Sequence, residues 1–163
     1  MTKCYMQRPL TLFITVLTLA AASAASGQEA IKPISPGEPP ADQPLKVFKG
    51  IERAWSGGDA AGIAAFVGEG RVSIDVRGIG QRGGEFSRSQ VLYLFRRMFE
   101  SDKQTKFEFV KFHNLDKPDR KVFGIAYRSY KNNRSGKVYQ DKVYVTLGRE
   151  GPGWVVAEIK TAR

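Results

Sequence analysis

Five side chains carry groups that could exchange a proton in a protected site: Asp75, His113, Tyr127, Asp141 and Tyr144. Acid–base catalysis needs a base held in a dry pocket and a donor for the developing negative charge. Asp75 alternates opposite apolar neighbours and His113 lies beside a polar loop, so both are expected at the surface. Asp141 shares the parity of Val143, which predicts an inward position near a rim, although adjacent lysines could simply pair with it. Asp141 and Tyr127 remain as the candidate catalytic pair.

The same strand-like segments carry apolar side chains that could line a ligand pocket without any reaction. Pockets for small molecules are usually apolar walls with a few polar groups. A hydrophobic core needs the same residue types, and a core is the simpler interpretation. The candidate pocket residues are Phe107, Phe109, Phe123, Ile125, Tyr127, Val143 and Val145.

A basic hairpin is predicted at 130–139, where Lys131, Arg134 and Lys137 lie between Tyr130 and Tyr139. Basic side chains beside aromatic rings suit contact with phosphate groups combined with stacking. For an exported protein, the partner would be an anionic lipid or an acidic glycan rather than DNA. The alternative is an ordinary solvated turn.

Residues 78–83 read Gly-Ile-Gly-Gln-Arg-Gly, which has the G-x-G-x-x-G spacing of dinucleotide-binding loops. A dinucleotide site needs its helix to begin within the motif, so that the helix amides meet the pyrophosphate. Here the predicted helix cap is Ser87, which lies beyond the last glycine, and no further strand–helix repeat follows. We therefore expect no nucleotide and interpret the glycines as loop residues.

The composition restricts the kinds of site that this chain can build. Its 163 residues include one cysteine, Cys4, and one histidine, His113. Neither a disulfide framework nor a metal cluster based on cysteine or histidine is possible, and we expect no cofactor. The formal net charge of +10 comes from bases spread along the chain, so the surface should attract polyanions in general.

The first 27 residues have the features of a secretory signal: two bases, an apolar run and then small residues. Cleavage is expected after Ala24 or, failing that, after Gly27, and an uncleaved membrane anchor is the alternative. Residues 28–44 contain five of the eight prolines and predict an extended linker. The sequence therefore predicts a secreted or periplasmic protein with one domain at 45–163.

The clearest of the elements that must position these candidates is a helix at 87–100. Ser87 and Gln90 have the spacing of a capping box. An apolar stripe with helical spacing follows and includes Phe95 and Met98. This stripe should pack the helix against a sheet.

Shorter helices and several strands are predicted around that helix. Periodicity gives one helix from Leu45 to the Ser56-Gly57-Gly58 stop and a second helix capped by Asp59. Strict alternation at 71–77 predicts a half-buried strand before the long helix. Short turn-rich segments, which favour antiparallel hairpins, join four later strands at 106–113, 122–130, 138–147 and 154–160.

This order of elements resembles the nuclear transport factor 2-like (NTF2-like) fold, the cone also called cystatin-like or ketosteroid-isomerase-like. The resemblance implies an α+β fold: two short helices, one strand, a long helix, then four antiparallel strands in a curved sheet. The segments that are similar to the bacterial domain-of-unknown-function 4783 family, secreted proteins without an assigned activity, are 86–99, 106–109, 123–126 and 153–156. The long basic hairpin departs from the shorter turn expected in that family.

The resemblance also implies a pocket between the helices and the sheet, where distantly similar enzymes use buried Asp, His or Tyr side chains. We predict a secreted, non-catalytic binding domain whose partner is unknown, either a small apolar ligand or an anionic surface. The alternatives are a small enzyme of isomerase, dehydratase or hydrolase type in the same scaffold, and polyanion binding through the basic hairpin. Homodimerisation through the exposed sheet face is common in this fold type and would use Tyr144, Thr146 and Trp154.

Overall fold

The computed structural model of the protein describes residues 43–79, 83–117 and 121–162. The predicted signal, nearly all of the linker and the middle of the glycine motif therefore lie outside the described residues. None of the helices in these three ranges is long and apolar enough to cross a membrane.

Two helices open the domain, α1 over Pro44–Ser56 and α2 over Ala60–Ala65. Proline is tolerated in the first turn of α1, where its missing N–H has no intrahelical partner in any case. The chain turns between the helices at Gly58, whose φ of 67° is a conformation that glycine adopts without strain. Asp59 then caps α2, because its Oδ1 accepts a hydrogen bond from the Gly62 amide at 2.9 Å. Both predicted helices and the predicted cap are confirmed.

The long helix α3 spans Arg88–Ser101. Its first turn is tied to the preceding residue, since Oε1 of Gln90 accepts a hydrogen bond from the Ser87 amide at 2.9 Å. The predicted stripe faces the interior: Val91 and Phe95 are fully buried, Met98 nearly so, and Leu94 is partly buried. The helix is therefore held by one apolar face, as its spacing predicted.

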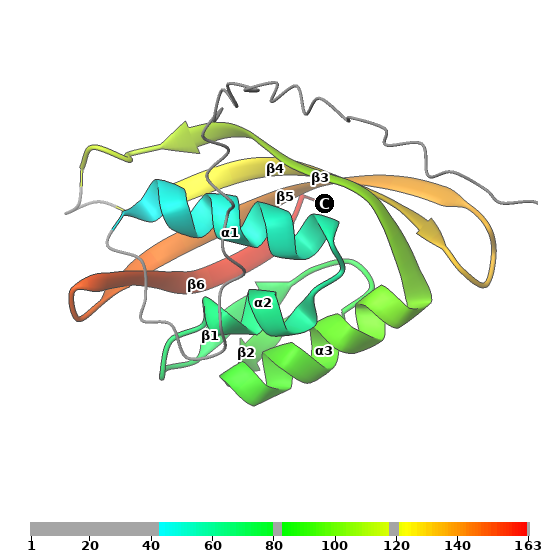
Figure 1. The fold of residues 1–163 in the computed structure, drawn as a ribbon, viewed down its shortest axis with the longest axis horizontal. Coiled ribbons are helices and arrows are strands. Elements are labelled where there is room, and N and C mark those ends of the chain that lie inside the picture. The colour runs from blue at the N-terminus through cyan, green and yellow to red at the C-terminus, as the bar shows by residue number, and fades with distance from the viewer. Residues whose placement is uncertain (1–42, 80–82, 118–120, 163) are drawn as a thin grey trace, which may run out of the picture. The chain divides into compact units, whose positions relative to one another are not determined.

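Within the described residues, six strands form one mixed sheet (Figure 1). They are β1 (Val72–Asp75), β2 (Gly84–Phe86), β3 (Asp102–His113), β4 (Val122–Asn132), β5 (Val138–Glu150) and β6 (Gly153–Thr161). Their order in the sheet is β2-β1-β6-β5-β4-β3. The pairs from β3 to β6 are antiparallel, as the short turns predicted, whereas β1 pairs with β6 in parallel.

The sheet contains two features that the sequence did not reveal. Strand β2 has three residues, which is too short for alternation to be recognised. Strand β3 starts at Asp102, directly after α3, because the polar run before Phe107 hides the strand from hydropathy. The sheet therefore has one strand more than predicted, and helix passes into strand without a loop.

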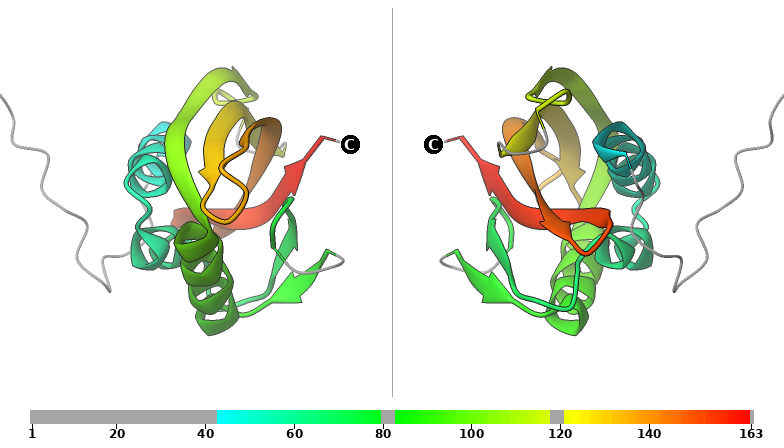
Figure 2. Two further views of the ribbon diagram at one scale, coloured as in Figure 1. Left: turned by 90° about the vertical axis from the view of Figure 1, so that its right-hand side faces the viewer. Right: turned by 90° about the vertical axis from the view of Figure 1, so that its left-hand side faces the viewer.

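The sheet is curved, and the helices pack against its inner face (Figures 1 and 2). An aromatic cluster joins helices and sheet: the ring of Trp55 stacks on Phe107 at 4.3 Å between centroids and meets the edge of Phe95 at 5.0 Å. Offset-stacked and edge-to-face pairs of this kind add to the stabilisation from burial. On the inner face of β4, Gly124 leaves room for Phe109, because a Cβ there would come within 2.7 Å of that ring.

Candidate functional site

A buried arginine interrupts the apolar inner face of the sheet. Arg128 lies on β4 with a relative exposure of 0%, on the same face as Val122 and Ala126. Burial of an unpaired guanidinium would be very costly, so its surroundings must compensate the charge. Its Nε donates to Oε1 of Gln104 at 2.9 Å, and its Nη1 donates to the backbone oxygen of Arg77 at 3.1 Å.

The first compensating charge is Asp102, the residue at which α3 ends and β3 begins. Oδ2 of Asp102 accepts a hydrogen bond from Nη2 of Arg128 at 3.3 Å, and Oδ1 accepts one from Nδ2 of Asn132 at 2.9 Å. Asn132 in turn opens the β4–β5 hairpin, where its Oδ1 accepts from the Ser135 amide at 2.9 Å. One carboxylate therefore connects the helix end, the buried arginine and the hairpin.

The second compensating charge is Asp141, directly opposite Arg128 in the β4–β5 pair. Its Oδ2 lies 3.9 Å from Nη1 of Arg128, and its Oδ1 lies 3.0 Å from Nη1 of Arg77. The Asp141 side chain is 2% exposed, whereas the Arg77 side chain is 57% exposed. Arg77 therefore covers a buried carboxylate from the solvent side.

A tight turn directly after Arg77 places its side chain beside Asp141. Gly78 has φ 89°, and the Ile79 amide donates to the Val76 oxygen at 2.9 Å, so the chain turns immediately after Arg77. A Cβ at Gly78 would lie 3.4 Å from Oδ2 of Asp102, in a conformation that side chains rarely adopt. The first glycine of the G-x-G-x-x-G segment thus permits the turn that brings Arg77 to the site.

Two aromatic rings lie near the guanidinium of Arg128. The guanidinium of Arg128 lies 3.8 Å from the ring centroid of Tyr130 and 6.0 Å from that of Trp55. Burial raises the pKa of Tyr130, and the negative charge of Asp141 raises it further, so the phenol stays protonated. Burial also lowers the pKa of Arg128, against the opposing effect of Tyr130 and the two aspartates. We call Arg77, Asp102, Arg128, Tyr130 and Asp141 the interior cluster.

Two buried polar atoms next to Arg128 have no hydrogen-bond partner among the described residues: Oδ2 of Asp141 and Nε1 of Trp55. Most buried polar atoms in proteins are paired, so unpaired ones need an explanation. An acceptor and a donor left open near one charge-compensated arginine have the chemistry of a binding site for a polar group. Among the described residues, Tyr130 is the neighbour of Asp141 that could exchange a proton with a substrate.

The structure separates the predicted catalytic pair. Asp141 does point inward, as its parity predicted, but Tyr127 lies on the opposite face of β4 with 42% exposure. Tyr127 is opposite Lys142, whereas Asp141 is opposite Arg128. Because alternate residues of a strand point to opposite faces, this pair cannot act on one substrate.

The predicted pocket lining divides in the same way. Phe107, Phe109, Val143 and Val145 are buried on the inner face. Phe123, Ile125 and Tyr127 alternate with the buried residues of β4 and occupy the outer face. The seven residues therefore cannot line one cavity, and the inner four are part of the hydrophobic core.

The other predicted side chains lie outside the interior cluster. His113 is at the end of β3 and stacks on Phe123, with 4.4 Å between ring centroids. Tyr144 lies on the outer face, where Lys142 approaches its ring at 5.4 Å. Of the residues proposed for a dimer contact, Trp154 is only 3% exposed beneath Arg149, so it offers no contact surface.

The predicted basic hairpin is present and is hydrogen-bonded to the end of α3. Lys131, Arg134 and Lys137 are all exposed around the β4–β5 turn. Gly136, with φ 69°, closes the turn, and the Asn133 amide donates to the Ser101 oxygen at 2.9 Å. The turn is therefore fixed to the end of α3.

Sequence reasoning missed Arg128 and Asp102. Both faces of β4 contain apolar residues, and the alternating set with Phe123, Ile125 and Tyr127 is the bulkier one. Hydropathy therefore favours the wrong set as the inner face. The available signal was the shared position of Arg128 and Asp141, which a short hairpin brings opposite each other with opposite charges.

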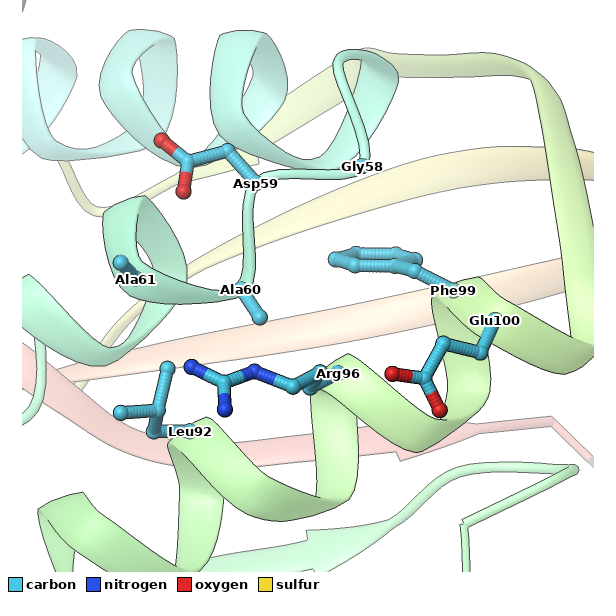
Figure 3. A pocket seen from close by; sticks show the side chains of 8 residues that line it. All are labelled: Gly58, Asp59, Ala60, Ala61, Leu92, Arg96, Phe99 and Glu100. Carbon is cyan, nitrogen blue, oxygen red and sulfur yellow. The ribbon is translucent and has the colours of Figure 1, made fainter.

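A separate hollow of about 390 Å³ lies between the start of α2 and α3 (Figure 3). The side chains of Arg96 and Glu100 lie along α3 at its edge, while that of Asp59 is turned away to cap α2 (Figure 3). No member of the interior cluster lines it. Its lining residues are Gly58, Asp59, Ala60, Ala61, Leu92, Arg96, Phe99 and Glu100.

No protein-family model and no curated protein sequence matches the chain. Solved structures do resemble it. A DUF4783 family protein from Bacteroides uniformis ATCC 8492 aligns with a TM-score of 0.58 at 14% identity, covering 71% of this chain and 94% of that one. A DUF4783 family protein from Bacteroides ovatus ATCC 8483 aligns at 0.55 and 16%, covering 69% and 90%.

A third structural neighbour is a hypothetical protein with a ketosteroid isomerase-like fold from Catenulispora acidiphila, solved in complex with trimethylamine. It aligns with a TM-score of 0.57 at 12% identity, covering 74% of this chain and 86% of that one. Identities this low establish the fold alone. The chain therefore has the NTF2-like cone fold, with DUF4783 proteins among its structural neighbours, as the order of its elements predicted.

Proposed function

We propose that this chain is an exported, non-catalytic binding domain for a small ligand, and that the ligand binds at the interior cluster. The observation that carries the proposal is Asp141, a buried carboxylate. Its Oδ2 lies 3.9 Å from Arg128 Nη1 and has no hydrogen bond within the described residues, and its Oδ1 is covered by the half-exposed Arg77. A carboxylate in that position favours a ligand with a positively charged or strongly donating group.

The charges of the interior cluster favour a cation in particular. Asp102 and Asp141 carry two negative charges, and Arg128 supplies one buried positive charge. Arg77 supplies the second from the solvent side. If Arg77 swings outward, the interior holds one negative charge in excess, beside the rings of Tyr130 and Tyr139, which stack at 5.4 Å. An ammonium group is attracted by both the carboxylate and the aromatic faces.

The fold neighbour that holds trimethylamine supports a ligand of this class in this scaffold. Catalysis is the less favoured function, because the exposed Tyr127 lies on the opposite face of the sheet and cannot assist Asp141. The predicted signal supports a location outside the cytoplasm.

The test is titration of the folded domain with trimethylammonium chloride, read by ¹H–¹⁵N NMR. The indole N–H signal of Trp55 should shift, because Arg128 connects it to the site; the variant Trp154→Phe assigns the two indole signals. Arg77→Ala should bind the cation more tightly, since it removes the competing guanidinium, and Asp141→Asn should abolish binding.

Sodium acetate at matched ionic strength provides the comparison ligand. Equal shifts with acetate and with trimethylammonium would contradict a cation site. If Asp141→Asn still binds the cation, the interior cluster is not the binding site. The hollow beside Arg96 is then the alternative site.

A further inference from the structure

Among the described residues, no helix or strand covers the outer face of β3, β4 and β5, which carries an excess of lysines. The β-pairing places them in rows across the strands: Lys103 is opposite Lys131, and Lys131 is opposite Val138. On the same face of β4 and β5, further from the turn, Lys142 is opposite Tyr127. Side chains directly opposite each other in antiparallel strands share one face. We define the basic face as Lys103, Lys111, Tyr127, Lys131, Val138, Lys142 and Tyr144.

The four lysines of the basic face have no acidic partner among the residues that the structure describes. None of the four forms an ion pair within the described ranges, whereas Lys106 and Lys160 on the same face are neutralised by Glu108 at 2.6 Å and Glu158 at 3.1 Å. Two further bases, Arg134 and Lys137, extend the basic face at the turn. Uncompensated charges concentrated on one surface create a field that attracts anions.

Exposed apolar and aromatic side chains lie among the lysines. Val138 is 70% exposed at the tip of the hairpin, and Tyr127 is 42% exposed in the middle of the face. A turn that only faces water gains no stability from an exposed valine side chain. Basic residues around exposed apolar side chains are typical of surfaces that enter the head-group region of a membrane.

We propose that the basic face docks on a membrane surface rich in anionic phospholipid, with the 131–138 tip entering the head groups. A second copy of the chain is the poorer occupant. A symmetric contact through this face would bury several lysines against lysines, because Glu108 and Glu158 are already paired within their own strands. The proposal is independent of the interior cluster, which lies on the inner face.

The test is co-sedimentation of the folded domain with vesicles at low salt. We expect binding to mixed phosphatidylcholine–phosphatidylglycerol vesicles and none to pure phosphatidylcholine. Lys131→Glu, Arg134→Glu and Lys137→Glu together should reduce the affinity at least about 100-fold, since each base near an anionic surface contributes about a fivefold factor. Val138→Ser should reduce it roughly three- to tenfold.

The matched control carries the same charge change on the helical side: Arg53→Glu, Arg96→Glu and Arg97→Glu, all exposed. It should retain most of the binding. Equal losses in both triple variants would overturn the proposal, because net charge alone would explain them. Binding to heparin without binding to anionic vesicles would also overturn it in favour of an acidic glycan, and equal binding to neutral vesicles would exclude the charge-based mechanism.

Discussion

The two faces of β4 and β5 treat positive charge in opposite ways. On the inner face, Arg128 is surrounded by two carboxylates, an amide oxygen and a backbone oxygen. On the outer face, Lys131 and Lys142 face water with no acidic partner in the described part of the chain. The difference follows from solvation, since water compensates an exposed charge and only other groups can compensate a buried one. Charges that a fold neutralises internally stabilise its geometry, and charges that it leaves open are available to a partner.

The largest expected effect on stability comes from removing the buried positive charge of Arg128 on the inner face. Arg128→Met should destabilise the domain by about 3–5 kcal/mol, because Asp102 and Asp141 would remain buried without their shared counter-charge. Urea unfolding followed by circular dichroism measures this. Adding Asp102→Asn and Asp141→Asn to the same chain should restore much of the loss. A triple variant no more stable than Arg128→Met would indicate that the arginine acts through packing.

A smaller loss of stability is expected from a change at Asn132, which connects Asp102 on the inner face to the β4–β5 hairpin. Asn132→Ala removes the hydrogen bonds to Asp102 and to the Ser135 amide, and should lower the free energy of unfolding by about 1–2 kcal/mol. Lys131→Ala is the control next to it and should change stability very little. Similar losses in the two variants would mean that the turn tolerates no substitution at all.

The raised pKa of Tyr130 predicts a pH dependence at the alkaline end. The folded state retains the phenol proton after the unfolded chain has lost it, so this stabilisation is complete below about pH 10 and disappears as the pH rises through the folded-state value. Above that pH, the midpoint temperature of thermal unfolding should therefore fall less steeply with pH in Tyr130→Phe than in the parent protein. Tyr93→Phe, on the exposed side of α3, controls for removal of a hydroxyl.

The smallest expected effect is on the outer face. Charge reversal at Lys131, Arg134 and Lys137 should change the free energy of unfolding by less than about 0.5 kcal/mol, because these side chains are exposed and form no ion pair within the described residues. Chemical denaturation of the triple variant tests this. A loss comparable to that of Asn132→Ala would show that the bases stabilise the hairpin, and the contrast between the two faces would fail.

Local signals were sufficient to predict most of the fold from the sequence. The caps at Asp59 and at Ser87 with Gln90, and the stripe through Phe95 and Met98, each lie within a few residues of the structure that they specify. The antiparallel hairpins that join β3 to β6 were equally predictable from their turns. The parallel pairing of β1 with β6 was not, because no local pattern connects residues so far apart in the chain.

The candidate site was predictable only in part. Asp141 was recognised by its parity, but Arg128 belongs to a strand with apolar residues on both faces, and the bulkier set pointed outward. Asp102 lies in a polar stretch that reads as a loop, yet it begins an edge strand. Both residues acquire their meaning from contacts across the sheet, which hydropathy does not encode.

The direct passage from α3 into β3 at Asp102 has a consequence for the motions of the domain. The Asp102 side chain and the Ser101 oxygen hold the hairpin through Asn132 and Asn133, so the hairpin cannot open while the end of α3 stays in place. Hydrogen exchange should therefore release the amide protons of Asn132, Asn133 and Gly136 as one cooperative group. That group should exchange much faster in Arg128→Met, while the amides in the middle of α1 lag behind it.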